Sequence, residues 1–351
     1  MARGGRRGDD QLKGERRGAR FPAPARFCRL ERVNRALALL LVALAAPAAA
    51  NDSVAGHSAG GLVLARSADI DMLSEDLFVS AAEVRVRYVF RNRSGREVRT
   101  TVAFPMPDRD RTEEHFSDVA YPERFRTLVD GRPVAMAVER RAFLKGVDRT
   151  ALLGELGLSP DAEGKALDAL PAAARARLLK LGLAAVDEYD DGHGWERHLV
   201  PAWTERETWH WEQAFPAGRD LVVEHRYVPG TGGSVGSGLA LREFRASSEG
   251  RRTIERYCAD GAFLAGLDRL ARRAGGIVPE QRIGYVLTTG ANWRAPIGRF
   301  RLVVDKGAPD NLVSFCAEGV RKISPTRFEL VRTNWRPDRD LDVMIVLPAP
   351  R

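Results

Sequence analysis

The sequence predicts a mainly β protein, an antiparallel fold of the β-sandwich kind with one inserted helical segment and a short second helical patch. Two observations predict strands: apolar and polar residues alternate in many short runs, and Gly, Pro, Asn or Asp separate these runs. A third observation predicts the insertion, because a stretch rich in Ala and Leu interrupts the alternation. Period-two alternation is typical of half-buried strands, and many short strands separated by turns favour a sandwich.

Residues 1–50 have the features of a signal peptide. A strongly basic segment is followed by the uncharged run Ala36–Ala50, which ends in small residues. This order is typical of a secretory leader, so we expect cleavage between Ala50 and Asn51 and export to the periplasm or the extracellular space. The run is shorter than the ~20 apolar residues of a stable membrane span, and we expect no such span in the mature chain. An uncleaved anchor is the alternative.

The net charge of +8 belongs mostly to this leader. Residues 1–35 carry eleven of the 55 basic residues and four of the 47 acidic ones, which leaves 44 basic and 43 acidic residues in the remainder. A nearly neutral chain with interspersed charges lacks the electrostatic footprint of a nucleic-acid-binding protein. We therefore expect no nucleic-acid partner.

A first β region is expected over residues 51–144. In Glu83–Asn92, valines and aromatic residues share one face of a strand and arginines the other. Turn residues follow, and the next strand ends at Pro105, so these two strands are expected to form a hairpin. A second hairpin, Phe125–Phe143, is expected to fold at Asp130-Gly131.

A helical insertion is expected over residues 145–190. Ala and Leu recur there at three- and four-residue spacing. Ser159-Pro160 predicts the start of a helix, with Pro in its first turn. Pro171 is expected to divide the rest of the segment into two helices.

A C-terminal β region is expected over residues 191–351. Two alternating runs, separated by a short turn, predict a hairpin that pairs Trp211 with His225 and Trp209 with Tyr227. The short helical patch and several short strands complete the chain.

The glycine-rich stretch His225–Gly238 raises the question of a phosphate-binding loop. Leu239-Ala240 occupies the place where a Walker loop has Lys and Ser or Thr, and Val235 replaces the last glycine of a dinucleotide fingerprint. We therefore expect only a turn after a strand, with no phosphate and no cofactor. Alanine at Gly232 or Gly233 should cost about 1 kcal/mol or less per site, unless φ is positive there.

Residues between Asp187 and Glu212 are the candidates for metal or acid–base chemistry. A calcium loop that began at Asp187 would have Tyr189 and His198 where oxygen ligands are needed. His210 and Glu212 share the outer face of a strand and provide at most half a metal site. The sequence also lacks the motifs of serine hydrolases and zincins. We assign no catalytic residue, no metal ligand and no cofactor.

Four tryptophans lie close together in the sequence: Trp195, Trp203, Trp209 and Trp211. Together with His225, they could form a surface on which a sugar or a peptide stacks, or they could anchor the core between two β layers. The sequence leaves both interpretations open.

The cysteines predict one disulfide. Cys28 lies in the leader, which leaves Cys258 and Cys316 in the mature chain. An exported chain with an even pair of cysteines is expected to join them, although two buried thiols are the alternative.

Several segments, in this order, carry a resemblance to a known family: SEDLFVS, VRVRYVFRNRSGREVRTTVAFPMP, WEQAFPAG, VEHRYVPGTGGS, ANWRAPIGRFRLVVDKG and NLVSFCAEGVRKISPTRFEL. Over residues 51–348 the chain resembles the bacterial exported family known as domain-of-unknown-function family 4424. The resemblance implies export and a shared fold. It includes no catalytic motif and therefore implies no activity.

Two classes of function follow. The first is an exported, non-enzymatic β-sandwich protein that binds an envelope component, a ligand or a protein partner. The alternative is an extracytoplasmic hydrolase of unfamiliar type, with its acids between Asp187 and Glu212. An enzyme should have carboxylates and histidines with shifted pKa values in one cleft, and a binding protein need not. This difference distinguishes the two classes of function.

Overall fold

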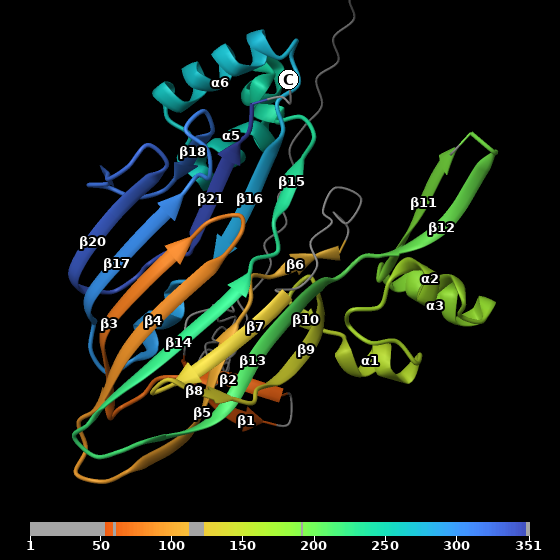
Figure 1. Cartoon of the computed structure of the whole chain (residues 1–351). Helices are drawn as coiled ribbons and strands as arrows, with labels where there is room; N and C mark the ends of the chain where they lie inside the picture. The colour runs from red at the N-terminus through yellow and green to blue at the C-terminus, as the bar shows by residue number, and fades with distance from the viewer. Residues whose placement is uncertain (1–52, 59–60, 112–122, 191, 349–351) are drawn as a thin grey trace, which may run out of the picture. The chain divides into compact units, whose positions relative to one another are not determined.

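Antiparallel sheets make up most of the chain, which confirms the predicted fold class (Figure 1). The computed structural model describes residues 53–58, 61–111, 123–190 and 192–348. The predicted leader and its cleavage site at Ala50 and Asn51 lie outside the described residues.

The largest sheet has eight strands in the order β19-β20-β17-β3-β4-β14-β7-β8. All its neighbours pair antiparallel except β17 and β3, which are parallel. Its strands are β3 (Ile70–Val79), β4 (Val84–Asn92), β7 (Glu123–Val129), β8 (Arg132–Val134), β14 (Asp220–Val228), β17 (Ile297–Asp305), β19 (Arg321–Lys322) and β20 (Arg327–Trp335).

A seven-stranded sheet and a four-stranded sheet complete the main β structure. The seven-stranded sheet contains β1 (Ser53–Ser58), β2 (Gly61–Ala65), β5 (Val98–Pro105), β6 (Arg109–Asp110), β9 (Ala137–Leu144), β10 (Val147–Asp148) and β13 (Thr204–Phe215). The four-stranded sheet contains β15 (Gly232–Ser234), β16 (Glu280–Tyr285), β18 (Leu312–Phe315) and β21 (Leu341–Val346).

The main core lies between the inner faces of these three sheets. It includes Phe90 of the eight-stranded sheet, Phe104 of the seven-stranded sheet and Tyr285 of the four-stranded sheet, all at most 1% exposed. In β4 the alternate residues Val84, Val86, Tyr88 and Phe90 point into this core, as the sequence pattern predicts. Each large apolar side chain buried in this way contributes about 1.5–3 kcal/mol.

Two of the predicted hairpins are wrong. Strand β4 belongs to the eight-stranded sheet and β5 to the seven-stranded one, and the same separation applies to β14 and β13. At both turns the chain crosses from one sheet to the other. Asn92 connects the two crossovers, because its Nδ2 donates to the carbonyl oxygens of Arg96 (2.7 Å) and Phe215 (2.8 Å).

The third predicted hairpin is confirmed in part. Strands β7 and β8 pair around Asp130-Gly131, with Val129 opposite Arg132. Strand β9 then joins the seven-stranded sheet instead of continuing the pair.

The segment between β10 and β13 contains three helices and a two-stranded hairpin. The helices are α1 (Thr150–Glu155), α2 (Gly164–Asp168) and α3 (Ala172–Leu181), and the hairpin joins β11 (Ala184–Asp190) to β12 (Trp195–Pro201). Pro171 caps the N-terminus of α3 and separates it from α2, as predicted. The helix start predicted at Ser159-Pro160 is wrong, because these residues precede a turn.

The second helical patch packs on the four-stranded sheet. It contains η2 (Gly238–Ala240), α4 (Arg242–Ala246), α5 (Ser248–Tyr257) and α6 (Gly261–Arg273); a further turn, η3 (Thr288–Asn292), precedes β17. The predicted disulfide joins Cys258, after α5, to Cys316, after β18, with Cα atoms 5.0 Å apart. Within the described ranges, none of the helices is both long enough and apolar enough to span a bilayer.

Candidate functional site

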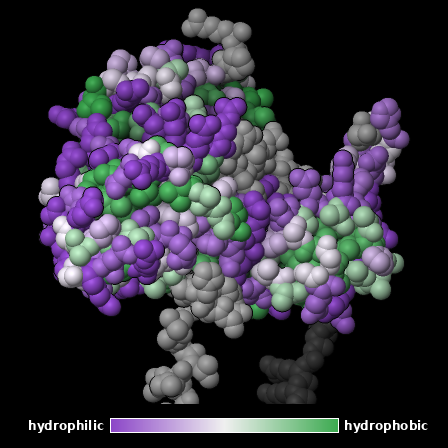
Figure 2. Space-filling view, turned by 60° about the horizontal axis from the view of Figure 1, so that its bottom comes forward, coloured by the Kyte–Doolittle hydropathy of each residue, from purple (hydrophilic) through white to green (hydrophobic). Residues whose placement is uncertain are grey.

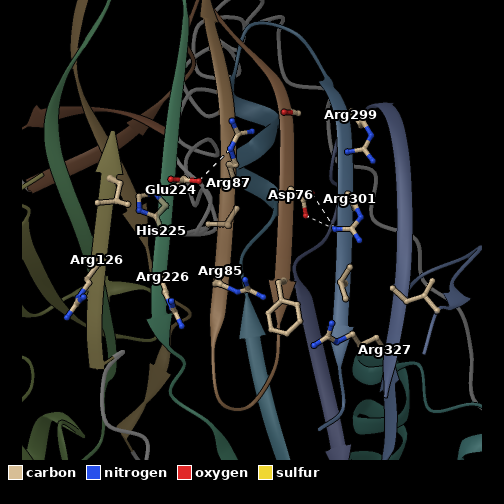
Figure 3. A pocket seen from close by; sticks show the side chains of 16 residues that line it. Asp76, Arg85, Arg87, Arg126, Glu224, His225, Arg226, Arg299, Arg301 and Arg327 are labelled. Atoms are coloured by element: carbon tan, nitrogen blue, oxygen red, sulfur yellow. Dashed lines mark hydrogen bonds and ion pairs between the residues drawn. The ribbon is translucent and has the colours of Figure 1, made fainter. Parts of the chain in front are cut away.

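An arginine-lined groove lies on the outer face of the eight-stranded sheet (Figure 3). Its volume is about 710 Å³. Strands β3, β4, β7, β14 and β17 provide most of its lining, since residues that alternate with the core-facing ones point outward. The lining residues are Ser74, Asp76, Phe78, Arg85, Val86, Arg87, Arg126, Leu128, Glu224, His225, Arg226, Arg299, Arg301, Val303, Ile323 and Arg327.

The groove is strongly cationic. Seven arginines line it against two carboxylates, those of Asp76 and Glu224, an excess of five positive charges. All of its cations are arginines, whose planar guanidinium groups match carboxylate, sulfate and phosphate oxygens with paired hydrogen bonds.

Three of these arginines oppose one another directly on adjacent strands. In the strand register, Arg226 of β14 lies opposite Arg85 of β4 on one side and opposite Arg126 of β7 on the other. Like charges directly opposed across a sheet are destabilising. The row of three is therefore a cost to the fold, which the ion pairs of Glu83 with Arg85 and Arg226 offset only in part.

Carboxylates neutralise the groove only in part. Glu83 forms ion pairs with Arg85 (3.1 Å) and with Arg226. Arg87 lies 3.6 Å from Glu224. With these pairs formed, the row of Arg85, Arg226 and Arg126 still has more positive than negative charge.

The β17 side of the groove has its own pairs. Arg301 contacts Asp76 (3.1 Å) and Glu329 (2.9 Å). The Phe78 ring is covered by two guanidinium groups, those of Arg85 at 4.5 Å and Arg327 at 5.6 Å from its centroid. Cation–π contacts of this kind hold both guanidinium groups over the floor of the groove.

Two arginines of the groove, Arg126 and Arg299, form no ion pair or hydrogen bond with any described side chain. Both are exposed, Arg126 on β7 and Arg299 on β17. Their guanidinium groups have hydrogen-bond donors available for a bound anion.

A second, smaller cavity of about 440 Å³ adjoins the β7 end of the groove. It shares Arg126 and Arg226 with the groove and adds Arg124 and Glu83. Arg124 has a positive φ of 60° at a point where the register between β14 and β7 shifts. The cationic surface therefore continues along β7 from Arg126 to Arg124, near the start of the strand.

The groove is better suited to binding than to catalysis. The histidine in its lining, His225, is only 2% exposed, and its Nδ1 lies 2.8 Å from the Thr127 hydroxyl on the core side. The groove carboxylates Asp76 and Glu224 both have arginine neighbours. Within the groove, the groups that face solvent are therefore mainly guanidinium donors.

The strongly perturbed carboxylates lie elsewhere, on the inner face of β13. Burial raises the pKa of Glu205 to about 7, although Arg111 lies 3.1 Å away, and burial also raises the pKa of Glu207. Glu207 accepts hydrogen bonds from Arg140 and from Trp209 Nε1 (2.7 Å). Neither carboxylate lines the groove or the adjoining cavity. They form a buried ionic cluster between β13 and the inserted segment.

The structure does not bring the four tryptophans together. Trp195 is 78% exposed at the start of β12, whereas Trp203 is buried in the separate core of the inserted segment, where its Nε1 donates to the Pro160 oxygen (2.7 Å). Trp209 and Trp211 pack in the main core near His225.

Of the two predicted aromatic pairs, Trp211 and His225 are in contact, but across two sheets, and Trp209 and Tyr227 are joined only through a third ring. The rings of Trp211 and His225 are 5.5 Å apart in an edge contact. Phe125 stacks on Trp209 (4.9 Å) and on Tyr227 (5.1 Å), and so connects these two rings.

Exposed apolar side chains are concentrated in the inserted segment. Figure 2 shows hydrophobic residues grouped on the part that holds α1–α3, and a second hydrophobic band on the larger part of the molecule. The large exposed apolar side chains of the segment between β10 and β13 are Leu179, Leu181, Val186, Tyr189 and Trp195, and Val147 lies just before it in β10.

The candidate metal residues do not gather into one site. Glu212 accepts a hydrogen bond from the Thr101 hydroxyl, and His198 lies between Asp168 (2.9 Å) and Glu196 (3.0 Å). Asp187 lies in β11, opposite His198. In the part of the chain that the structure describes, no three His, Cys, Asp or Glu residues are arranged to hold a metal ion.

The glycine-rich stretch continues into the edge strand β15. Gly233 lies so close to β16 that a Cβ there would be 2.4 Å from the Glu280 carbonyl oxygen, whereas Gly232 has no neighbour closer than 3.8 Å. The glycine at 233 is thus required by close strand pairing, which the sequence did not reveal.

The structure defines an antiparallel β protein with a cationic groove on one sheet. The chain belongs to the family described as domain of unknown function (DUF4424), whose model matches residues 50–344. This confirms the resemblance inferred from the sequence. No curated protein matches the chain.

Among solved structures, the chain is similar to a Legionella pneumophila protein titled a "putative nutrient binding protein". The two share 14% sequence identity with a TM-score of 0.40, and the match covers 84% of this chain and 72% of the other.

Proposed function

We propose that this chain is an exported, non-enzymatic β protein that binds an anionic ligand in the groove on its eight-stranded sheet. The observation that carries the proposal is the row Arg85, Arg226 and Arg126, in which like charges oppose one another on adjacent strands. An anion placed over the row would replace this repulsion with charge-assisted hydrogen bonds, which are stronger than neutral ones.

The alternative of a hydrolase has less support. Burial raises the pKa of three of the described carboxyl groups. Asp108 pairs with Arg206 (3.0 Å), whereas Glu205 and Glu207 are each 1% exposed and are held by Arg111, Arg140 and Trp209. General acid–base catalysis needs such groups within reach of a substrate, and these face a packed interior. Their contacts favour a structural role at the base of the inserted segment.

Export is supported by the leader-like residues 1–50 and by the disulfide between Cys258 and Cys316, since disulfides persist mainly in oxidising compartments. Intact-mass analysis of the protein recovered from the periplasm or the medium tests this part. We expect a chain that begins at Asn51. A recovered chain that retains Ala36–Ala50 would contradict the cleavage.

Calorimetric titration tests the anion site. We expect citrate, pyrophosphate or sulfated dextran to bind the protein, while neutral dextran does not. The double variant Arg126→Gln/Arg226→Gln should weaken binding by at least about tenfold, since two charge-assisted contacts are lost. The matched control is Arg99→Gln, which removes an exposed arginine from β5 on the seven-stranded sheet and should leave affinity unchanged. Absence of binding by all three anions, or equal losses in both variants, would contradict the proposal.

A further inference from the structure

We infer that the ligand of the groove is an extended anionic polysaccharide strand that lies across β7, β14, β4, β3 and β17. This inference rests on the proposed anion-binding function and names the class of ligand.

The arginines without an ion pair to described residues lie at opposite ends of the groove. Arg126 is on β7 and Arg299 is on β17, and three strands separate them. Neighbouring strands are about 4.8 Å apart, so four strand intervals span about 19 Å across the sheet. The register places Arg299 level with Val222, four residues from Arg226, which adds about 13 Å along the strands and gives a separation of about 23 Å. A compact anion such as phosphate cannot contact both ends, whereas a chain that crosses the strands can.

The carboxylates alternate with arginines in one row of the groove. In the strand register, Arg301, Asp76, Arg87 and Glu224 follow one another across β17, β3, β4 and β14. An ionised carboxylate only accepts hydrogen bonds, so Asp76 and Glu224 would repel a uniformly charged polymer and accept bonds from hydroxyl groups. An anionic saccharide chain has groups of both kinds: spaced anionic groups that can accept from the arginines, and hydroxyl groups between them that can donate to the carboxylates.

The groove does not offer a stacking platform for nucleic-acid bases. Single-stranded nucleic acids are usually bound by exposed aromatic rings combined with basic residues. Of the aromatic residues in the lining, Phe78 is covered by Arg85 and Arg327, and His225 is buried. The groove therefore presents guanidinium donors and no free aromatic face, which favours a sulfated, phosphorylated or carboxylated glycan.

The experiment uses heparin-derived sulfated oligosaccharides of increasing length, from disaccharide to decasaccharide, with affinity measured by fluorescence anisotropy at fixed ionic strength. We expect affinity to rise steeply with length until the chain spans about 23 Å, and then to level off. Arg126→Gln and Arg299→Gln should each weaken the long oligosaccharide by about tenfold, and the double variant by about a hundredfold, because distant sites act additively. The disaccharide should lose affinity in at most one of the two single variants.

The control variant is Arg99→Gln, and circular dichroism with thermal melting checks that each variant is folded. An affinity that does not depend on oligosaccharide length, with small anions bound equally well, would overturn the extended ligand while the anion-binding function stands. A single-stranded oligonucleotide that binds more tightly than the oligosaccharide of the same charge would overturn the saccharide class. If none of these anions binds, both the inference and the proposed function are wrong.

Discussion

Replacing Arg126 by Gln should stabilise the ligand-free protein. Arg126 directly opposes Arg226 across β7 and β14, is exposed, and forms no ion pair with a described residue. Two unit charges about 6 Å apart in water repel by about 0.7 kcal/mol, and screening at physiological ionic strength reduces this to about 0.3 kcal/mol. The ion pair between Arg226 and Glu83 lowers the gain further. We expect an increase in the free energy of unfolding of about 0.3–0.7 kcal/mol at low salt.

Urea denaturation at low and at high ionic strength measures this difference. The gain of Arg126→Gln should be largest near 0.01 M salt and disappear near 1 M, where the Debye length is only about 3 Å. Arg126→Lys retains the charge and should show no gain. Arg91→Gln, which removes an ion pair to Asp220 between the neighbouring strands β4 and β14, should lose a few tenths of a kcal/mol instead. A variant Arg126→Gln that is less stable than the wild type, or a gain that does not change with salt, would refute the electrostatic reasoning.

Three further results are expected. Cys316→Ser opens a loop of 58 residues in sequence and should lower the free energy of unfolding by up to about 4 kcal/mol. Denaturation with and without reductant measures this, and equal stability of the wild type and the variant under non-reducing conditions would count against it. The raised pKa of Glu205 favours its protonated form in the fold, so its stabilising contribution is complete below pH 4.5 and is lost as the pH rises through about 7, a change of about 3 kcal/mol. Glu205→Gln should flatten this part of the pH–stability profile, and an unchanged slope would argue against the assignment. Gly233→Ala should lower the free energy of unfolding by more than about 1 kcal/mol, because the new Cβ meets the Glu280 carbonyl oxygen, whereas Gly232→Ala should lower it by less. Thermal melting compares the two variants, and equal effects would contradict the close approach at Gly233.

The alternation of residues predicted the strands but not their partners. In β13, Trp211 and Phe215 face inward, and in β14 Leu221 and Val223 do so. This pattern is the same whether two consecutive strands pair side by side or face each other across a sandwich. One feature that accompanies the second arrangement is the hydrogen bond from Asn92 to the Phe215 carbonyl, which joins the two crossovers and links residues more than 100 positions apart.

The sequence predicted only one side of the groove. The arginines of Glu83–Asn92 were identified as the outer face of a strand, but their neighbours on β17 come from a parallel pairing with β3. Arg301 and Asp76 are 225 residues apart in the sequence, and no local pattern relates them. The nearly neutral charge of residues 51–351 also concealed the groove, because acidic residues elsewhere balance its arginines.

The core of the sandwich contributes far more to stability than the repulsion between the groove arginines removes. Substitutions in the core and in the groove should therefore change stability and binding in different ways. Strands β3, β4, β14 and β17 are central in the sheet, and each presents buried apolar residues to the core, worth about 1.5–3 kcal/mol apiece. The repulsion between opposed arginines amounts to a few tenths of a kcal/mol, so the core fixes the backbone regardless of it. Substitutions in the core should therefore reduce stability and binding together. Substitution of Arg126, which opposes Arg226 and has no carboxylate partner among the described residues, should reduce binding while it increases stability. These opposite signs distinguish a binding surface from a structural one.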